Sequence, residues 1–171
     1  RLMYLHPMMA RPELLEVFGD VRTALPYVDM PIQHGSDGVL RAMRRGTTAD
    51  RIRELVARLR DRDPRMTLRT TVLLGFPGET EADVDALCAL LAEVQFDRLG
   101  TFTYSREEGS ASFRCPDQVP AAVTQARFDR LMQLAQAIAA EVNARAVGTT
   151  CDVVIDESAP EDPHQFIGRT A

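Results

Sequence analysis

Hydrophobic positions along the chain follow two alternating patterns, short runs of strand length and longer stripes with helical spacing. The strand-like runs cover residues 1–6, 27–32, 67–74 and 98–104. The helical stripes follow them at about 11–18, 37–44 with 52–59, 84–94 and 120–146. Strands that alternate with helices are typical of βα units, which build a parallel sheet with right-handed crossovers. The pattern therefore predicts an α/β fold.

Two architectures fit four such units. A closed eight-stranded barrel usually needs about 250 residues, and this chain has 171. The alternatives are an open doubly wound sheet and part of a barrel. Because the first residues already have the pattern of a strand, we predict the second and interpret the chain as a fragment. A strand at 150–155 and the Pro-rich segment beyond it indicate a further domain, so we place one domain at 1–147 and the start of another at 148–171.

The segment Arg69–Thr80 predicts a tight turn between a buried strand and a helix. Gly75 and Gly78 permit backbone angles that a side chain would block. Thr80 is a suitable N-cap, and Asp83 occupies the capping-box position three residues later. Turns of this kind, at the carboxyl ends of parallel strands, are where α/β proteins bind ligands. From the residues alone the turn is either structural or part of a binding site.

Alternation along 67–74 divides that strand into two faces. Leu68, Thr70, Val72 and Leu74 share the face suited to packing under helices, whereas Arg69, Thr71 and Leu73 share the face toward a barrel interior. A guanidinium enclosed there without a partner would cost several kcal/mol. Arg69 therefore requires an anion, either a structural carboxylate such as Asp29 or the carboxylate of a bound ligand.

Other candidate residues stand at the ends of the predicted strands. If the strands are parallel, His6, Gln33 and Tyr104 emerge at the same edge as Gly75. Gln33 carries both a donor and an acceptor, which suits ribose hydroxyls or an amino group. His34 is either a structural hydrogen-bonding group or a metal ligand, with no second His or Cys nearby at ligand spacing. Tyr104 is either a core residue or a cover for a flat aromatic ligand.

Composition narrows the function classes only slightly. Hydrophobic content of 45% with 26% charged residues is typical of a folded globular protein. No apolar run approaches membrane-spanning length and no signal peptide is visible, which predicts a cytoplasmic protein without a membrane partner. The net charge of −5 disfavours coating of nucleic acid and favours a basic partner. Glu107 and Glu108 are either a solvated pair or an acidic hook for such a partner. The spacing of the three cysteines fits neither a zinc site nor a redox motif.

Several segments, taken together and in order, resemble the radical S-adenosylmethionine methylthiotransferases. They are Leu5–Pro7, Asp29–Asp37, Val39–Arg45, Arg69–Thr80, Phe96–Gly100 and Tyr104–Ser110. This resemblance implies the parallel βα half of a radical S-adenosylmethionine (radical SAM) partial TIM barrel, followed by the start of a TRAM domain, a small substrate-binding β-barrel. Within it, Thr71-x-Leu73-x-Gly75 is similar to the Gly-x-Ile-x-Gly segment that flanks the adenine.

Two branches of that family differ at two places in this sequence. The branch that modifies adenosine in tRNA usually has Gln-Ser-Gly-Ser at residues 33–36 and Tyr-Ser-Pro-Arg-Pro-Gly at 104–109. The branch that modifies an aspartate of a small-subunit ribosomal protein has Gln-His and Tyr-Ser-x-Glu-Glu-Gly, as this chain does. The resemblance thus implies a methylthio transfer to the β-carbon of that aspartate. The alternatives are the tRNA enzyme and a non-catalytic half-barrel binding module.

The resemblance also implies the cofactors and their sites. The family uses S-adenosylmethionine and two 4Fe-4S clusters, but the Cys-x-x-x-Cys-x-x-Cys loop is absent here. We therefore expect that this chain ligates neither cluster and is inactive without the amino-terminal half of the same polypeptide. The expected S-adenosylmethionine pocket comprises Gln33, His34, Arg69, Thr71, Leu73, Gly75 and Tyr104, with Arg69 as the carboxylate partner. Glu107 and Glu108 are expected to contact the substrate, and no catalytic residue or metal ligand is assigned.

Overall fold

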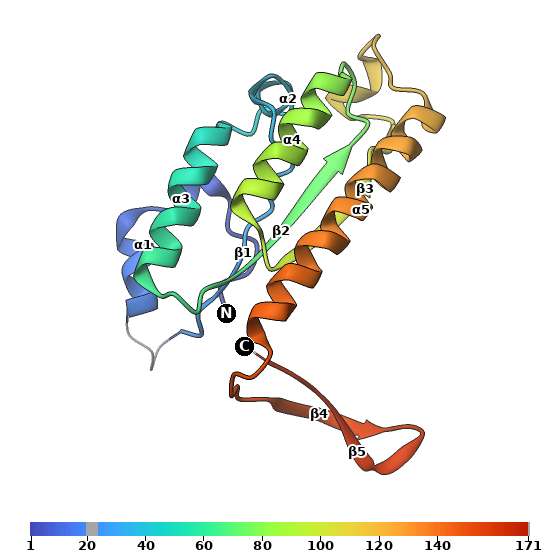
Figure 1. Ribbon diagram of the computed structural model, residues 1–171. Helices are drawn as coiled ribbons and strands as arrows, with labels where there is room; N and C mark the ends of the chain where they lie inside the picture. Colours follow the sequence, from blue (N-terminus) through green and yellow to red (C-terminus); the bar gives the residue numbers. More distant parts are fainter. Residues whose placement is uncertain (20–23, 171) are drawn as a thin grey trace.

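A three-stranded parallel sheet lies at the centre of the computed structural model, which describes residues 1–19 and 24–170. Its strands, in spatial order, are β1 (Tyr27–Asp29), β2 (Thr67–Leu74) and β3 (Arg98–Thr103). The α-helices are α1 (Pro12–Glu16), α2 (Asp37–Ala42), α3 (Ala49–Arg62), α4 (Glu81–Val94) and α5 (Ala121–Ala146). Short 3-10 helices form η1 (Pro7–Met9), η2 (Val17–Gly19) and η3 (Ala111–Arg114). Helices α3, α4 and α5 lie side by side over one face of the sheet (Figure 1), which confirms the α/β prediction.

The strand predicted at residues 1–6 is reduced to an isolated bridge at the sheet edge. Leu2 pairs in parallel with Val28, and the Leu5 amide donates to the carbonyl of Asp29 at 2.8 Å. Between these contacts Tyr4 has a φ of 59°, a left-handed angle that interrupts an extended chain. The segment therefore follows β1 without forming a regular strand.

β1 is also shorter than predicted, because the segment after Asp29 contains one more residue than the part of β2 that it faces. Asp29 pairs with Arg69, but the next bridge joins Gln33 to Val72, so four steps on one chain match three on the other. Gln33 has a φ of 71°, and Pro31 has no amide hydrogen to donate. The irregular pairing is that of a β-bulge, which ends the strand and redirects the residues that follow.

The two faces of β2 differ as the sequence predicted. Leu68, Thr70, Val72 and Leu74 are all fully buried under the helices. Arg69 lies on the opposite face with 46% of its side chain exposed, and Thr71 and Leu73 are only partly buried. That face of the sheet is covered by no helix among the described residues.

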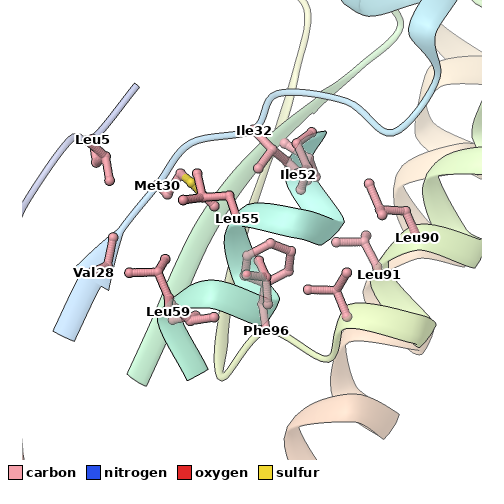
Figure 2. Packing of buried hydrophobic residues seen from close by; sticks show 14 of the residues in the cluster. Leu5, Val28, Met30, Ile32, Ile52, Leu55, Leu59, Leu90, Leu91 and Phe96 are labelled. Carbon is pink, nitrogen blue, oxygen red and sulfur yellow. The ribbon is translucent and has the colours of Figure 1, made fainter. Parts of the chain in front are cut away.

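The core fills the space between the sheet and the helices. Figure 2 shows Ile52, Leu55 and Leu59 of α3 directed toward Val28 and Met30, with Leu90 and Leu91 of α4 beside them. The predicted stripe of α3 is buried throughout. Each fully buried aliphatic side chain of this kind contributes roughly 1.5–3 kcal/mol, so this single cluster fixes how the helices sit on the strands.

The helix ends follow local sequence signals. Thr80 and Asp83 form the predicted capping box at the start of α4, and Gln95 ends that helix in a left-handed conformation. Helix α5 runs for 26 residues and buries Leu131 and Ile138, two positions of its predicted seam. Gly148, with a φ of 83°, follows its last turn.

Beyond α5 an antiparallel hairpin is formed by β4 (Val154–Ala159) and β5 (Asp162–Arg169). The predicted strand at 150–155 was placed too early, because Val154 is the first residue with a partner, Arg169. The hairpin projects away from the helical layer (Figure 1) and its residues are largely exposed. A second small sheet is consistent with the start of a barrel, and the domain boundary at 147/148 stays a prediction. Across the described ranges, no helix combines the length and hydropathy needed to span a membrane.

We predict that Gly35→Ala destabilises the fold by about 1–3 kcal/mol through overpacking. A Cβ at residue 35 would lie 2.7 Å from the Cα of Leu87, and neither backbone can yield easily. Gly38→Ala is the matched control, because its Cβ would meet nothing closer than 3.5 Å and alanine favours a helix. Urea unfolding of both variants measures the difference. Equal stability of the two variants would contradict the close approach of the residue 35 backbone to α4.

Candidate functional site

The carboxyl ends of the three strands meet at one edge of the sheet, which we call the rim: residues 33–36, 74–80 and 103–105. The Gln33 amide donates to the Thr71 carbonyl at 3.0 Å, and the Leu73 amide donates to the Gln33 carbonyl at 2.8 Å. On the other side the Tyr104 amide donates to the Leu74 carbonyl at 2.7 Å. The structure thus brings together Gln33, Leu73 and Tyr104, as predicted.

Side-chain groups at the rim retain unused hydrogen-bonding capacity. The Tyr104 ring packs edge-on against Phe76, with centroids 5.6 Å apart at an angle of 73°. Its hydroxyl is buried but has no hydrogen-bond partner, and the half-buried side-chain amide of Gln33 bonds to none of the described residues. Buried polar groups are nearly always paired, so an unpaired phenol beside an aromatic ring is suited to a ligand with polar and flat parts.

The turn after β2 is held tightly against α5. Gly75 has a φ of 80°, and a Cβ there would lie 2.5 Å from Oγ1 of Thr124 in α5. The amide of Gly78 donates to the carbonyl of Asp117 at 2.7 Å. Glycine at residue 75 is therefore required both by the backbone angle and by the approach of the helix.

A buried carboxylate, Glu79, cross-links this turn. Its Oε2 accepts the Gly75 amide at 2.9 Å, and its Oε1 lies 2.9 Å from Nη1 of Arg127 in α5. The Glu79 side chain is fully buried, while Arg127 also reaches the exposed Glu81 at 2.7 Å. This network was not among the features predicted from the sequence. Its signal was Arg127 itself, a charged residue at a core-facing position of the α5 stripe, between Thr124 and Leu131.

His34 lies beneath the rim and is fully buried. Its Nδ1 accepts the Ser36 amide at 3.0 Å, and its Nε2 lies 3.4 Å from Oε2 of Glu79 without forming a hydrogen bond. These contacts support the structural alternative for His34. Because the side chain has no exposed surface, the structure does not place it on the open side of the rim.

Asp83 ties the start of α4 to Ser36, the N-cap residue of α2. Its carboxylate accepts the Ser36 hydroxyl at 2.5 Å and the Thr80 amide at 2.9 Å. Burial raises the pKa of Asp83, but the hydrogen bonds from Ser36 and Thr80 outweigh burial, so its pKa is lowered overall. The ionised carboxylate therefore fixes the helix start beside the rim at neutral pH.

Arg69 is not brought to the rim. It pairs in register with Asp29 and Arg98 near the amino-terminal end of β2, six residues before Gly75. At about 3.3 Å per residue this separation is roughly 20 Å. Its Nε lies 3.9 Å from Oδ1 of Asp29, whose side chain is buried. Asp29 is thus the anion beside Arg69, in line with the structural alternative, although Arg69 is half exposed and needs less compensation than an enclosed cation.

Glu107 and Glu108 are exposed on the loop that follows Tyr104. Glu107 accepts the Ser105 hydroxyl at 2.6 Å, and Arg106 stacks over the Phe113 ring at 4.6 Å. These contacts order the loop while leaving Glu108 free of any described partner. The loop therefore presents negative charge next to the rim.

The comparison with family models supplies the decisive observation. The model of the radical SAM superfamily matches residues 2–91, which is more than half of the chain. The chain belongs to the radical SAM superfamily. A solved member, coproporphyrinogen III oxidase (HemN) from Escherichia coli, aligns with a TM-score of 0.64 at 18% identity. The alignment covers 77% of this chain and 31% of that one, and it confirms the predicted fold as part of a radical SAM barrel.

Relatives with higher identity carry a more specific name. A ribosomal protein uS12 methylthiotransferase RimO from Opitutus terrae is 43% identical over 92% of this chain. One from Thermosynechococcus vestitus is 42% identical over 99% of it. The match covers 33% and 38% of those two proteins. The chain therefore spans about a third of the length of the curated relatives it matches.

Membership in the superfamily implies S-adenosylmethionine and iron–sulfur chemistry in general. Iron–sulfur clusters are held by cysteine thiolates, but Cys88, Cys115 and Cys151 are not brought together. No group of three potential ligands within 1–19 and 24–170 could hold a metal ion. That this chain ligates neither cluster stays a prediction. The unpaired phenol of Tyr104 and the free amide of Gln33 do fit a nucleoside with hydroxyl and amino groups.

We predict that Glu79→Gln destabilises the fold by about 3 kcal/mol, because it leaves Arg127 buried beside a neutral group. Glu81→Gln is the control on the same arginine. Glu81 is 63% exposed, and losing an exposed pair costs less than about 1 kcal/mol. Urea unfolding measures both. Equal losses in the two variants would show that the buried carboxylate is not what holds the turn to α5.

Proposed function

We propose that this chain forms the carboxyl-terminal half of the barrel of a radical SAM methylthiotransferase. In this proposal the complete polypeptide transfers a methylthio group to the β-carbon of an aspartate in a small-subunit ribosomal protein in the cytoplasm. The observation that carries the proposal is the match, across nearly the whole chain, to relatives named as methylthiotransferases of protein uS12. Sequence signatures at residues 33–36 and 104–109 point the same way.

The rim residues are proposed to hold S-adenosylmethionine. The Gln33 amide would bond its ribose or amino groups, and Tyr104 would cover the adenine while its unpaired hydroxyl gains a partner. Thr71 and Leu73 would form the wall below, where β2 faces the open side of the sheet, and the backbone of Gly75 would close the end of that wall. Because the Glu79 network fixes the turn, this pocket would be preorganised and would lose little entropy on binding.

The iron–sulfur clusters are proposed to lie outside this chain. S-adenosylmethionine and a reduced cluster supply the one-electron chemistry that activates the aspartate β-carbon. The residues of this chain would orient the nucleoside and help to exclude water. Two clusters, both ligated by the preceding part of the same polypeptide, are part of this proposal.

The exposed loop after Tyr104 is proposed to contact the substrate. Glu107 and Glu108 place two carboxylates beside the rim, and the chain carries a net charge of −5. Opposite charge accelerates encounter with a basic protein and is weakened by salt. The same charges would repel a tRNA backbone.

The direct test is methylthio transfer by the complete polypeptide with S-adenosylmethionine, a reductant and sulfide. The substrate is a basic peptide that contains the target aspartate, and mass spectrometry measures the gain of one methylthio group on that residue. We expect modification of the aspartate peptide and none of the matched asparagine peptide. An unmodified tRNA transcript is included in a parallel reaction. Modification of an adenosine in tRNA without modification of the peptide would contradict the proposal and favour the tRNA branch.

A further inference from the structure

Arg45 occupies a rigid position near the carboxyl end of β1. It follows α2 in a turn whose neighbours Arg44 and Gly46 both have left-handed backbone angles, with φ of 56° and 64°. The Arg45 amide donates to the Leu40 carbonyl at 2.9 Å. The left-handed backbone angles on both sides of Arg45 fix the direction in which its side chain leaves the backbone.

The Arg45 side chain reaches the chain just before the rim but is incompletely paired. Its Nη2 donates to the carbonyl of Pro31 at 2.8 Å, two residues before Gln33. Its Nε is buried without a hydrogen-bond partner, and no carboxylate of the described residues forms an ion pair with it. Burial lowers the pKa of Arg45. Other arginines of this chain, such as Arg53 and Arg127, do contact carboxylates.

The segment 6–8 packs against the turn that carries Arg45, because a Cβ at residue 46 would lie 3.5 Å from Cγ of Met8. Burial first, and then the charge of Arg45, lower the pKa of His6 below its ordinary value, which favours the neutral imidazole. Its Nδ1 accepts the Met8 amide at 3.2 Å, which leaves the proton on Nε2 as a second donor. A partly buried cation without a counter-charge, beside a neutral donor, favours an anion.

We propose that Arg45, with His6 near it, binds a carboxylate group next to the rim. The proposal rests on the function proposed above, in which the reactants carry such groups: the side chain of the target aspartate and the methionine part of S-adenosylmethionine. A guanidinium presents planar donors that match a carboxylate. The acidic loop at 107–108 makes a polyphosphate a poor alternative.

The test compares two ligand pairs on the complete polypeptide and its Arg45→Gln variant. The first pair is the basic peptide with aspartate or asparagine at the target position, and the second is S-adenosylmethionine and its decarboxylated form. We expect the native protein to bind the carboxylate-bearing member of one pair with a dissociation constant at least tenfold lower than that of the other member. Arg45→Gln should abolish this difference in affinity. Changing the protein and the ligand separately and together forms a thermodynamic cycle, which isolates the contact between Arg45 and the carboxylate from unrelated effects. Loss with the peptide pair assigns the carboxylate to the aspartate, and loss with the other pair assigns it to S-adenosylmethionine.

Arg41→Gln is the matched control, because Arg41 is exposed on the last turn of α2 and should leave both preferences intact. Arg45→Lys, which keeps the charge, should retain part of the preference. A preference unchanged by Arg45→Gln in both pairs, or absent from the native protein in both, would overturn the proposal.

Titration of His6 by NMR gives a readout that does not depend on activity. Arg45→Gln should raise the pKa of His6 toward its ordinary value, whereas Arg41→Gln should not. A folded Arg45→Gln variant with an unchanged pKa of His6 would contradict the proximity of the two groups. If the native protein modifies no aspartate peptide, the proposed function fails, yet the S-adenosylmethionine pair still decides the role of Arg45.

Discussion

The buried carboxylate of Glu79 is the interaction on which the rest of the rim depends. It binds the Gly75 amide at one oxygen and Arg127 of α5 at the other, and it contacts His34 in the segment between β1 and α2. The negative charge of Glu79 therefore links three segments that are far apart in sequence. A buried charge is costly unless it is fully paired, so this arrangement persists only when the turn, the helix and the strand end are all in place.

The constraint explains why the turn needs its particular residues. Gly75 allows both the backbone angle that aims its amide at Glu79 and the close approach of Thr124. The capping box formed by Thr80 and Asp83 then starts α4 directly after the turn. The rim is in this way rigid on its helix side. Next to it, Gln33 keeps a half-buried amide and Tyr104 a buried hydroxyl, both without partners among the described residues, which is the usual combination in a preorganised binding site.

Local patterns in the sequence predicted the elements whose signals lie within a few residues. β2 was predicted with its observed bounds because of its alternation and the Gly/Pro turn that follows it, and the capping box was visible as Thr80 and Asp83. The early end of β1 could not be predicted, because the bulge depends on register with β2. The Glu79–Arg127 pair joins residues 48 positions apart, a contact that only the docking of α5 creates. Arg69 was expected in the pocket because of the face of β2 that it shares with Thr71 and Leu73, but it lies near the amino-terminal end of that strand, away from the rim.

Membership in the radical SAM superfamily and the geometry of the rim support one central proposal: the strand ends at Gln33, Gly75 and Tyr104 would form one wall of a single nucleoside site. Hydrogen–deuterium exchange of the complete polypeptide with and without S-adenosylmethionine tests this claim most directly. We predict slower exchange in the peptides that contain residues 33–36, 73–79 and 103–106, with no change in α3. Protection confined to other segments, or protection of only one strand end, would contradict it.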